Sequence, residues 1–271
     1  MRVHLLIIDP QKDFMDDSDS ALPVPGANAD MKRLSAMIGR VGHKLEDIHV
    51  TLDSHRVIDV GHPGMWMNAK GEHPAPFTMI SADDIKNGIW TPRNPSLRKR
   101  MIDYAETLAK QGNYPLMVWP EHCKIGTPGH SIQKELLAAL EGWERKHFAN
   151  VDYVVKGTNA FTEHYGALMA EVPDPSDPAT GLNTALLDIL AEADFVAIAG
   201  EALSHCVKST VTQIADNLGD EYAQKFYILT DCSSTIPKVG NGPDFPAITE
   251  AWLKDMEKRG MTLTTSEKFL A

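Results

Sequence analysis

The chain has 271 residues, of which 43% are hydrophobic and 23% are charged, and its formal net charge is -11 at pH 7. This is an ordinary globular composition, and the acidic balance argues against nonspecific binding to nucleic acid or to an anionic membrane. No apolar stretch approaches the ~20 residues of a membrane span. The three cysteines, Cys123, Cys206 and Cys232, have no framework spacing. We therefore expect free thiols, a reducing compartment and a cytoplasmic location.

Short apolar runs alternate with helical patterns along the chain. The runs predict buried strands at 3–8, 47–52, 116–119, 153–155, 195–199 and 226–229, and a further short strand at 261–263. Apolar residues at helical spacing predict helices at 28–41, 96–111, 132–140, 182–190, 207–218 and 247–259. The alternation predicts an α/β fold: a doubly wound, mostly parallel six-stranded sheet with helices on both faces.

Two irregular stretches interrupt this alternation. Residues 56–95 are rich in proline and glycine and predict a long structureless insertion, which is typical of a lid or an oligomer contact. A homo-oligomer is therefore among the expected assemblies. The second irregular stretch runs from residue 158 to Gly181. We expect one domain, residues 1–271, with the insertion at about 56–95.

Side chains able to do chemistry follow most of the predicted strands. They are Asp9, Asp53, His55, His122, Lys156 and Cys206. Ligands of doubly wound sheets bind beyond the carboxyl ends of the strands. Each side chain has an ordinary structural explanation, such as a helix cap, a surface charge or a half-buried histidine. Their occurrence at one edge of one sheet favours a shared site.

Cys206 lies where the strand at 195–199 turns into a helix. Gly200 ends the strand, and the helical pattern begins at Val207. The positive end of a helix dipole stabilises an anion, so we expect a lowered pKa and a nucleophilic thiolate at Cys206. A small buried cysteine without chemistry is the structural alternative.

The side chains at the strand ends fall into two groups by type. Asp9, Lys156 and Cys206 combine a carboxylate that can take a thiol proton with an ammonium that balances charge. Asp53 and His55 leave their strand on the same side, and His122 would add a second imidazole. One carboxylate and two imidazoles with open positions suit Zn²⁺, Fe²⁺ or Mn²⁺.

Six short motifs occur in order along residues 1 to about 235. They are IDPQKDF at 8–14, ALPVPGA at 21–27, DSH at 53–55, WPEHC at 119–123, VKGT at 155–158 and HCV at 205–207. As an ordered set they resemble the isochorismatase-like cysteine hydrolases, and most closely the metal-containing nicotinamidases. This resemblance implies a hydrolase of linear amides that converts nicotinamide and water to nicotinate and ammonia, in pyridine nucleotide salvage.

The resemblance also implies a role for each catalytic residue. Cys206 would attack the amide carbonyl and form a thioester, and Asp9 would act first as base and then as acid. Lys156 would hold the charge balance. The backbone N–H groups of Ala202 and Cys206 would form the oxyanion hole, which in this family requires a cis peptide between Glu201 and Ala202.

The same resemblance implies how the substrate would be held. One divalent transition metal, zinc ahead of iron or manganese, would bind Asp53, His55 and His122 and hold the pyridine nitrogen. Phe14 and Trp119 would flank the ring, and His205 would line the substrate site.

Several alternatives stay open at this point. His205 stands where nicotinamidases carry an aromatic residue, and both irregular stretches are long, so another small amide or an N-carbamoyl compound is an alternative substrate. A binding protein without turnover is a third hypothesis, and the joint presence of Asp9, Lys156 and Cys206 argues against it. Cys123 is a second candidate ligand or nucleophile. The candidate fourth metal ligands are His62, His73, His130 and His164. Strand 3–8 is not followed by G-x-G-x-x-G, which argues against a dinucleotide-binding dehydrogenase.

Overall fold

The computed structural model describes residues 1–238 and 242–271. Six strands form the central sheet in the order β10-β9-β8-β1-β2-β7, and every neighbouring pair is parallel. The strands are β1 (Val3–Ile8), β2 (Asp47–Asp53), β7 (Asp152–Lys156), β8 (Phe195–Gly200), β9 (Phe226–Leu229) and β10 (Thr262–Thr264). The predicted six-stranded, doubly wound sheet is therefore confirmed.

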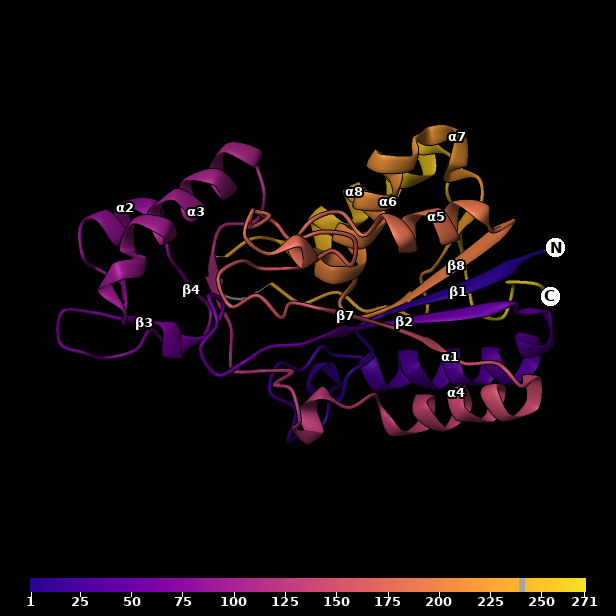
Figure 1. Cartoon of the computed structure of the whole chain (residues 1–271). Helices are drawn as coiled ribbons and strands as arrows, with labels where there is room; N and C mark the ends of the chain where they lie inside the picture. Colours follow the sequence, from indigo (N-terminus) through magenta and orange to yellow (C-terminus); the bar gives the residue numbers. More distant parts are fainter. Residues whose placement is uncertain (239–241) are drawn as a thin grey trace.

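Helices cover both faces of this sheet (Figure 1). One layer holds α1 (Ala27–Val41) and α4 (Lys134–His147), which lie side by side. The other layer holds α5 (Thr184–Glu192), α6 (Lys208–Leu218), α7 (Asp220–Ala223) and α8 (Phe245–Arg259). The central strand β1 is buried at all six residues, as its continuous apolar sequence predicts for a strand covered on both faces.

The strand predicted at 116–119 does not join the parallel sheet. It forms β6 (Met117–Val118), which pairs antiparallel with β4 (Thr78–Met79). The prediction of its place was wrong because an apolar run specifies burial and not the partner strand. The sixth place in the sheet belongs to β10, in the region where the sequence predicts a short extra strand.

The insertion is not structureless. It contains β3 (Trp66–Met67), which pairs antiparallel with β5 (Thr91–Pro92), and a short helix α2 (Ala82–Lys86) that packs on α3 (Arg98–Gln111). These elements share a hydrophobic cluster separate from that of the main sheet, made of Val60, Met65, Trp66, Ile80, Ile85, Met101, Tyr104, Ala105, Leu108, Leu116 and Val118. The insertion therefore extends through β6, and it stands beyond the carboxyl ends of the parallel strands in Figure 1.

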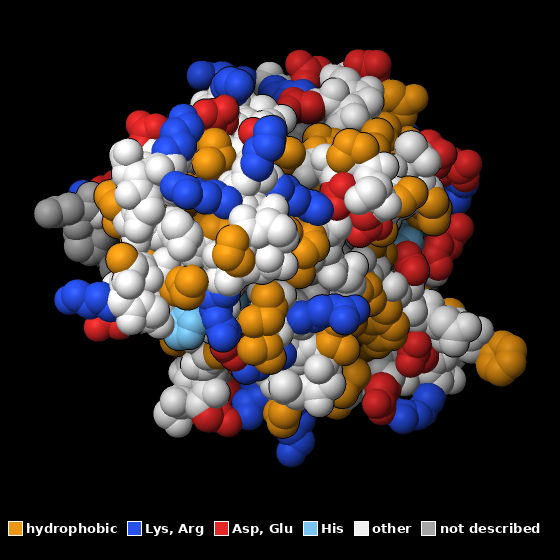
Figure 2. All heavy atoms as spheres, turned by 60° about the vertical axis from the view of Figure 1, so that its left-hand side comes forward, with side chains coloured by type: hydrophobic (Ala, Val, Ile, Leu, Met, Phe, Trp, Pro, Cys, Tyr) orange, Lys and Arg blue, Asp and Glu red, His pale blue; other side chains and the backbone are white. Residues whose placement is uncertain are grey.

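The remaining helical elements among the described residues are short turns. They are 3-10 turns at Lys12–Phe14, Gly42–Lys44, Pro63–Met65, Pro95–Leu97, Pro128–His130 and Pro178–Thr180, and a π-helical turn at Leu203–Val207. None of the helices in the described ranges is long and apolar enough to cross a membrane. On the face toward the insertion, charged and apolar side chains are interspersed (Figure 2). The exposed apolar side chains of the insertion are Val57, Ile58, Phe77, Met79 and Ile89.

Candidate active site

Asp9, Lys156 and Cys206 meet at the carboxyl end of the sheet. Asp9 follows β1, Lys156 ends β7, and Cys206 lies in the π-helical turn after β8. Lys156 Nζ lies 2.8 Å from Asp9 Oδ2 and 3.7 Å from Cys206 Sγ. All three side chains are buried. Residues that are far apart in the sequence thus form one carboxylate, ammonium and thiol group.

Thr51 on β2 fixes the carboxylate of Asp9. Its hydroxyl donates to Asp9 Oδ1 over 2.5 Å and accepts the backbone N–H of Asp9 over 3.0 Å. Asp9 Oδ2 lies toward the ammonium of Lys156, and the thiol of Cys206 is close enough for the Asp9 carboxylate to affect its pKa. One oxygen is therefore anchored to the sheet, and the other is directed toward Lys156 at the site.

The thiol of Cys206 is not activated by a lowered pKa. Burial raises its pKa well above the ordinary value, although the ammonium of Lys156 opposes this shift. The prediction of a lowered pKa was wrong because the turn that carries Cys206 is enclosed, and because the carboxylates of Asp9 and Asp53 lie nearby. Burial also raises the pKa of Asp9, again against the effect of Lys156. A reaction at this thiol would therefore need a neighbouring base to take its proton.

The turn before Cys206 depends on glycine. Gly200 has φ +119°, and a Cβ at this position would lie 2.0 Å from the backbone oxygen of Ile8. No other residue lets β8 come this close to β1. The peptide bond between Glu201 and Ala202 is cis, as the resemblance implies.

A second group of side chains adjoins Lys156. Asp53 Oδ2 lies 2.9 Å from His55 Nε2 and 3.5 Å from His122 Nε2, and all three residues are buried. One ligand atom from each lies within 4.8 Å of the others. Asp53 Oδ1 also lies 3.0 Å from Lys156 Nζ, so the two predicted groups form one continuous network.

The outer nitrogens of both histidines have partners of their own. His55 Nδ1 lies 3.1 Å from Asp59 Oδ2, and His122 Nδ1 lies 2.8 Å from the backbone oxygen of Pro120, to which it donates. Both Nε2 atoms are thereby directed toward Asp53, as metal-binding imidazoles are oriented in proteins. This oriented set of two nitrogens and one carboxylate oxygen fits a divalent transition metal such as zinc, iron or manganese.

The other candidate ligands lie outside this group, at least among the described residues. His62 packs against the rings of His55 and His122, but its Nε2 accepts the backbone N–H of His122 over 3.4 Å. His130 contacts the hydroxyl of Ser54, and His73 contacts the backbone oxygen of Trp66. His164 lines the adjacent pocket. Cys123 is buried, with a pKa raised well above its ordinary value by burial.

A small pocket of about 30 Å³ joins the two groups of side chains. It is lined by Phe14, Leu22, Val24, Asp53, Trp119, His122, Glu163, His164, Tyr165, Ala202, His205, Cys206 and Ile236. The structure thus brings the predicted substrate-binding residues Phe14, Trp119 and His205 to the same cavity as Cys206. Glu163 and Tyr165 were not predicted, because the irregular stretch at 158–181 has no periodicity that indicates which side chains face inward.

The fold can be compared with those of known proteins. No protein-family model matches the chain, and no curated protein matches its sequence. The structure is similar to that of a nicotinamidase and pyrazinamidase from Acinetobacter baumannii, with a TM-score of 0.64, 18% identity, and coverage of 99% of this chain and 98% of that chain. For the yeast nicotinamidase the TM-score is 0.63 with 18% identity, and the match covers 97% of this chain and 99% of that chain. A Pyrococcus horikoshii pyrazinamidase in complex with zinc has a TM-score of 0.57 and 19% identity, with coverage of 98% and 99%.

The chain has the nicotinamidase fold. The match extends over nearly the whole of both chains, so the insertion lies within the region covered. A shared fold does not determine a substrate, which depends on the side chains of the pocket.

His205, which precedes Cys206 in the chain, lies among aromatic rings at the pocket. Its ring lies 4.6 Å from that of Phe245, 4.9 Å from that of Tyr114 and 5.4 Å from that of Trp119. Burial lowers the pKa of His205 to about 3, so the imidazole is neutral. His205 therefore presents an uncharged flat ring to the pocket.

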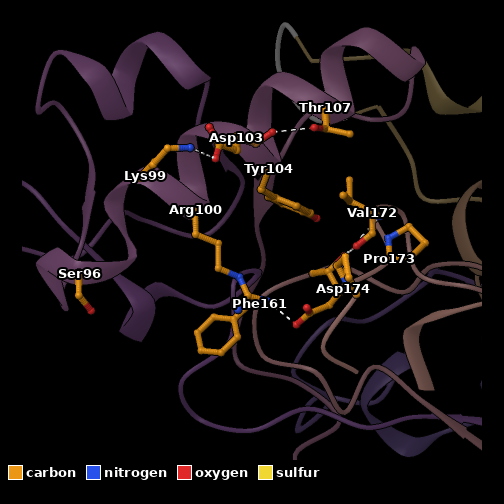
Figure 3. A pocket seen from close by; sticks show the side chains of 12 residues that line it. Ser96, Lys99, Arg100, Asp103, Tyr104, Thr107, Phe161, Val172, Pro173 and Asp174 are labelled. Atoms are coloured by element: carbon orange, nitrogen blue, oxygen red, sulfur yellow. Dashed lines mark hydrogen bonds and ion pairs between the residues drawn. The ribbon is translucent and has the colours of Figure 1, made fainter. Parts of the chain in front are cut away.

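A larger pocket of about 450 Å³ lies between α3 and the stretch at 158–181, away from Cys206 (Figure 3). Its charged side chains pair with one another: Arg100 with Asp174 over 2.6 Å, and Lys99 with Asp103 over 2.5 Å. The Arg100 guanidinium also stacks on the ring of Phe161. None of the predicted site residues lines this pocket.

Proposed function

We propose that this chain is a metal-containing cysteine amidohydrolase that acts on small amides, with nicotinamide as the first candidate substrate. One observation carries the proposal: a thiol paired with an ammonium and a carboxylate shares a pocket with an oriented set of two imidazoles and a carboxylate. The neighbours support it, because the yeast nicotinamidase was solved with the inhibitor nicotinaldehyde and a Leishmania infantum relative with nicotinate.

The first half of the reaction forms a thioester. Asp9 takes the proton of Cys206 as Sγ attacks the amide carbonyl carbon, and the backbone N–H groups of Ala202 and Cys206 stabilise the resulting oxyanion. The carbon–nitrogen bond then breaks, Asp9 returns the proton to the departing nitrogen, and ammonia leaves. Lys156 keeps the charge of the site balanced at each stage.

The second half releases the acid. A water molecule loses a proton to Asp9 as its oxygen attacks the thioester carbon. The carbon–sulfur bond breaks, and Sγ recovers a proton from Asp9, so that the carboxylic acid leaves and the thiol is restored. The same carboxylate thus serves both halves, which is why its fixed position on Thr51 matters.

Asp53, His55 and His122 would hold the metal ion. The bound ion would supply a Lewis acid for the ring nitrogen of the substrate. Zinc is the first candidate because the set combines imidazole and carboxylate donors, and iron and manganese bind similar sets. The ring would then lie between Phe14 and Trp119, with His205 closing the wall near the nucleophile.

A second candidate substrate is another small amide or an N-carbamoyl compound. It is favoured by the small volume of the pocket and by the histidine at position 205. A binding protein without turnover would not need the buried group of Asp9, Lys156 and Cys206, whose burial is energetically unfavourable. We further propose that residues 1–271 form one domain, and the three free buried cysteines support a cytoplasmic location.

The test is release of ammonia from nicotinamide and from a panel of small amides and N-carbamoyl compounds. We expect turnover of nicotinamide by the metal-loaded protein, and a loss of at least ~10³-fold in Cys206→Ala. Cys232→Ala is the matched control, because Cys232 is also a buried thiol but does not line the pocket. Full activity of Cys206→Ala would contradict the mechanism. Turnover of other amides alone would select the second substrate class, and no turnover at all would favour a binding protein.

A further inference from the structure

A second group of histidines and aspartates lies at the opposite end of the sheet. His4 comes from β1, Asp47 and His49 from β2, and Asp152 from β7. In the strand register, His4 is the partner of Asp47, and His49 is the partner of Asp152. Register partners, and residues two apart on a strand, face the same side of a sheet. The four side chains therefore form one row across the amino-terminal ends of three strands.

The two imidazoles are placed inside the core. His4 is 4% exposed and His49 is 2% exposed, whereas their strand neighbours are apolar and buried. An imidazole in such a place destabilises the fold unless both of its nitrogens have partners. The partners of these four ring nitrogens therefore matter for stability.

The outer nitrogen of His49 is hydrogen-bonded to a carboxylate, the outer nitrogen of His4 lies near another, and the two inner nitrogens contact each other. His49 Nδ1 lies 2.9 Å from Asp152 Oδ2, and His4 Nε2 lies 3.6 Å from Asp47 Oδ2. The inner pair, His4 Nδ1 and His49 Nε2, is 3.1 Å apart. With the His4 proton on Nδ1, this contact is an N–H···N hydrogen bond between two neutral imidazoles. With the His4 proton on Nε2 instead, both inner nitrogens have free lone pairs, and an ion beside the pair can bind both.

The geometry favours a metal ion. Imidazoles that donate an outer N–H to a carboxylate are the usual metal-binding arrangement. Two nitrogens 3.1 Å apart can both bind one zinc ion, since zinc–nitrogen bonds are about 2.0–2.1 Å long. His4, His49 and Asp47 each offer one donor atom within 4.8 Å of the other two, and Asp47 is 3.6 Å from His4 Nε2, too far for a hydrogen bond, so its carboxylate is available to an ion. The carboxylates of Asp47 and Asp152 are about half exposed, at 48% and 50%, which gives the ion access from solvent.

We infer that His4, His49 and Asp47 form a second binding site for a divalent transition metal of the zinc type, independent of the site at Asp53, His55 and His122. Asp152 acts as the outer partner that orients His49. An ion bound there would join β1 to β2 at the end of the sheet farthest from the catalytic pocket, so we assign the site a stabilising role in the fold. This inference does not depend on the proposed amidase activity.

The test uses the variant His122→Ala, in which the first site is weakened. The variant is freed of metal with a chelator and is then titrated with zinc chloride. We expect one zinc ion per chain to remain bound in His122→Ala, and its binding to raise the melting temperature by several degrees. Adding His49→Gln should abolish both the tight binding and the thermal shift. His43 is an exposed histidine near the start of β2, and adding His43→Gln should change neither the zinc binding nor the thermal shift.

A second measurement does not depend on how the double variant folds. In His122→Ala labelled with ¹⁵N, zinc should shift the imidazole signals of His4 Nδ1 and His49 Nε2 and remove any proton shared between them. Unchanged imidazole signals at saturating zinc would overturn the inference and leave the two imidazoles as a hydrogen-bonded pair. Equal zinc binding with and without His49→Gln would overturn it as well.

Discussion

The ammonium group of Lys156 lies 2.8 Å from the carboxylate of Asp9, and both side chains are almost completely buried. Lys156 also lies 3.0 Å from Asp53, so one cation serves a carboxylate of the proposed catalytic group and a carboxylate of the proposed metal group. Burial lowers the pKa of Lys156, but Asp53 and Asp9 outweigh this effect and raise the pKa well above its ordinary value. The ammonium is therefore charged throughout the working pH range.

Replacing Lys156 by methionine should leave two buried carboxylates without a counter-charge. We expect Lys156→Met to reduce the free energy of unfolding by ~3–5 kcal/mol and to abolish turnover. Urea unfolding measures the first effect and ammonia release the second. In the double variant Lys156→Met with Asp9→Asn, part of the stability should return while activity stays absent. Lys124→Met, which breaks only the surface pair with Glu121, should change stability by less than ~1 kcal/mol.

Thr51 is a positioning residue for Asp9. Thr51→Val keeps the shape of the side chain but removes the hydroxyl that holds the Asp9 carboxylate. We expect kcat to fall by ~10–100-fold with little change in KM, because the orientation of the base matters in the chemical step and not in substrate binding. Steady-state kinetics measure the two constants separately. Thr51→Ser restores a hydroxyl and should recover most of kcat; equal activity of the valine and serine variants would remove Thr51 from this role.

Asp59 should control the affinity of the metal site without touching the ion. Its carboxylate lies 3.1 Å from His55 Nδ1 and orients the ring. We expect Asp59→Asn to lower the metal affinity of the active site by ~10–100-fold, measured by competition with a chelator while ammonia release reports the loaded fraction. Asp188→Asn, which changes an exposed carboxylate on α5 away from both groups of histidines, is the control. An unchanged affinity in Asp59→Asn would show that His55 is oriented by other contacts.

Glu171 makes stability depend on pH in a specific direction. Burial raises its pKa from 4.5 to about 7, against the effect of Lys208. The folded state therefore binds this proton more tightly than the unfolded chain, so the stabilising contribution is complete below pH 4.5 and is lost as the pH rises to 7. Glu171→Gln removes this titration. Between pH 4.5 and 7, the free energy of unfolding of the variant should therefore rise by about 1–3 kcal/mol relative to that of the wild type. Denaturant unfolding between pH 4.5 and 8 measures this difference, which should stay constant for the exposed control Glu267→Gln.

Much of the fold and of the candidate site follows from the sequence, because both rest on short-range patterns. The apolar run at residues 3–8 indicates a strand covered on both faces. Gly200 indicates the turn that leads to Cys206. Asp53 and His55 are two residues apart at the end of a strand, so their shared direction needs no knowledge of the rest of the fold.

The features that the sequence does not predict depend on long-range packing. Burial reverses the expected pKa shift of Cys206, and burial is a property of the assembled pocket. The partner of β6 is decided by the separate core of the insertion. The pairing of His4 with His49 depends on the register of β1 and β2, although a histidine inside an apolar strand was a visible signal.

The insertion begins directly after His55 and ends shortly before His122, two of the side chains proposed to bind the same ion. An ion held by both would join the two ends of this segment and restrict the unfolded conformations open to it. Removing the ion should therefore loosen the insertion ahead of the parallel sheet, and proteases should cut first between these two histidines. The segment beyond the carboxyl ends of the strands would then become mobile while Cys206 and its neighbours on the parallel sheet were still in place.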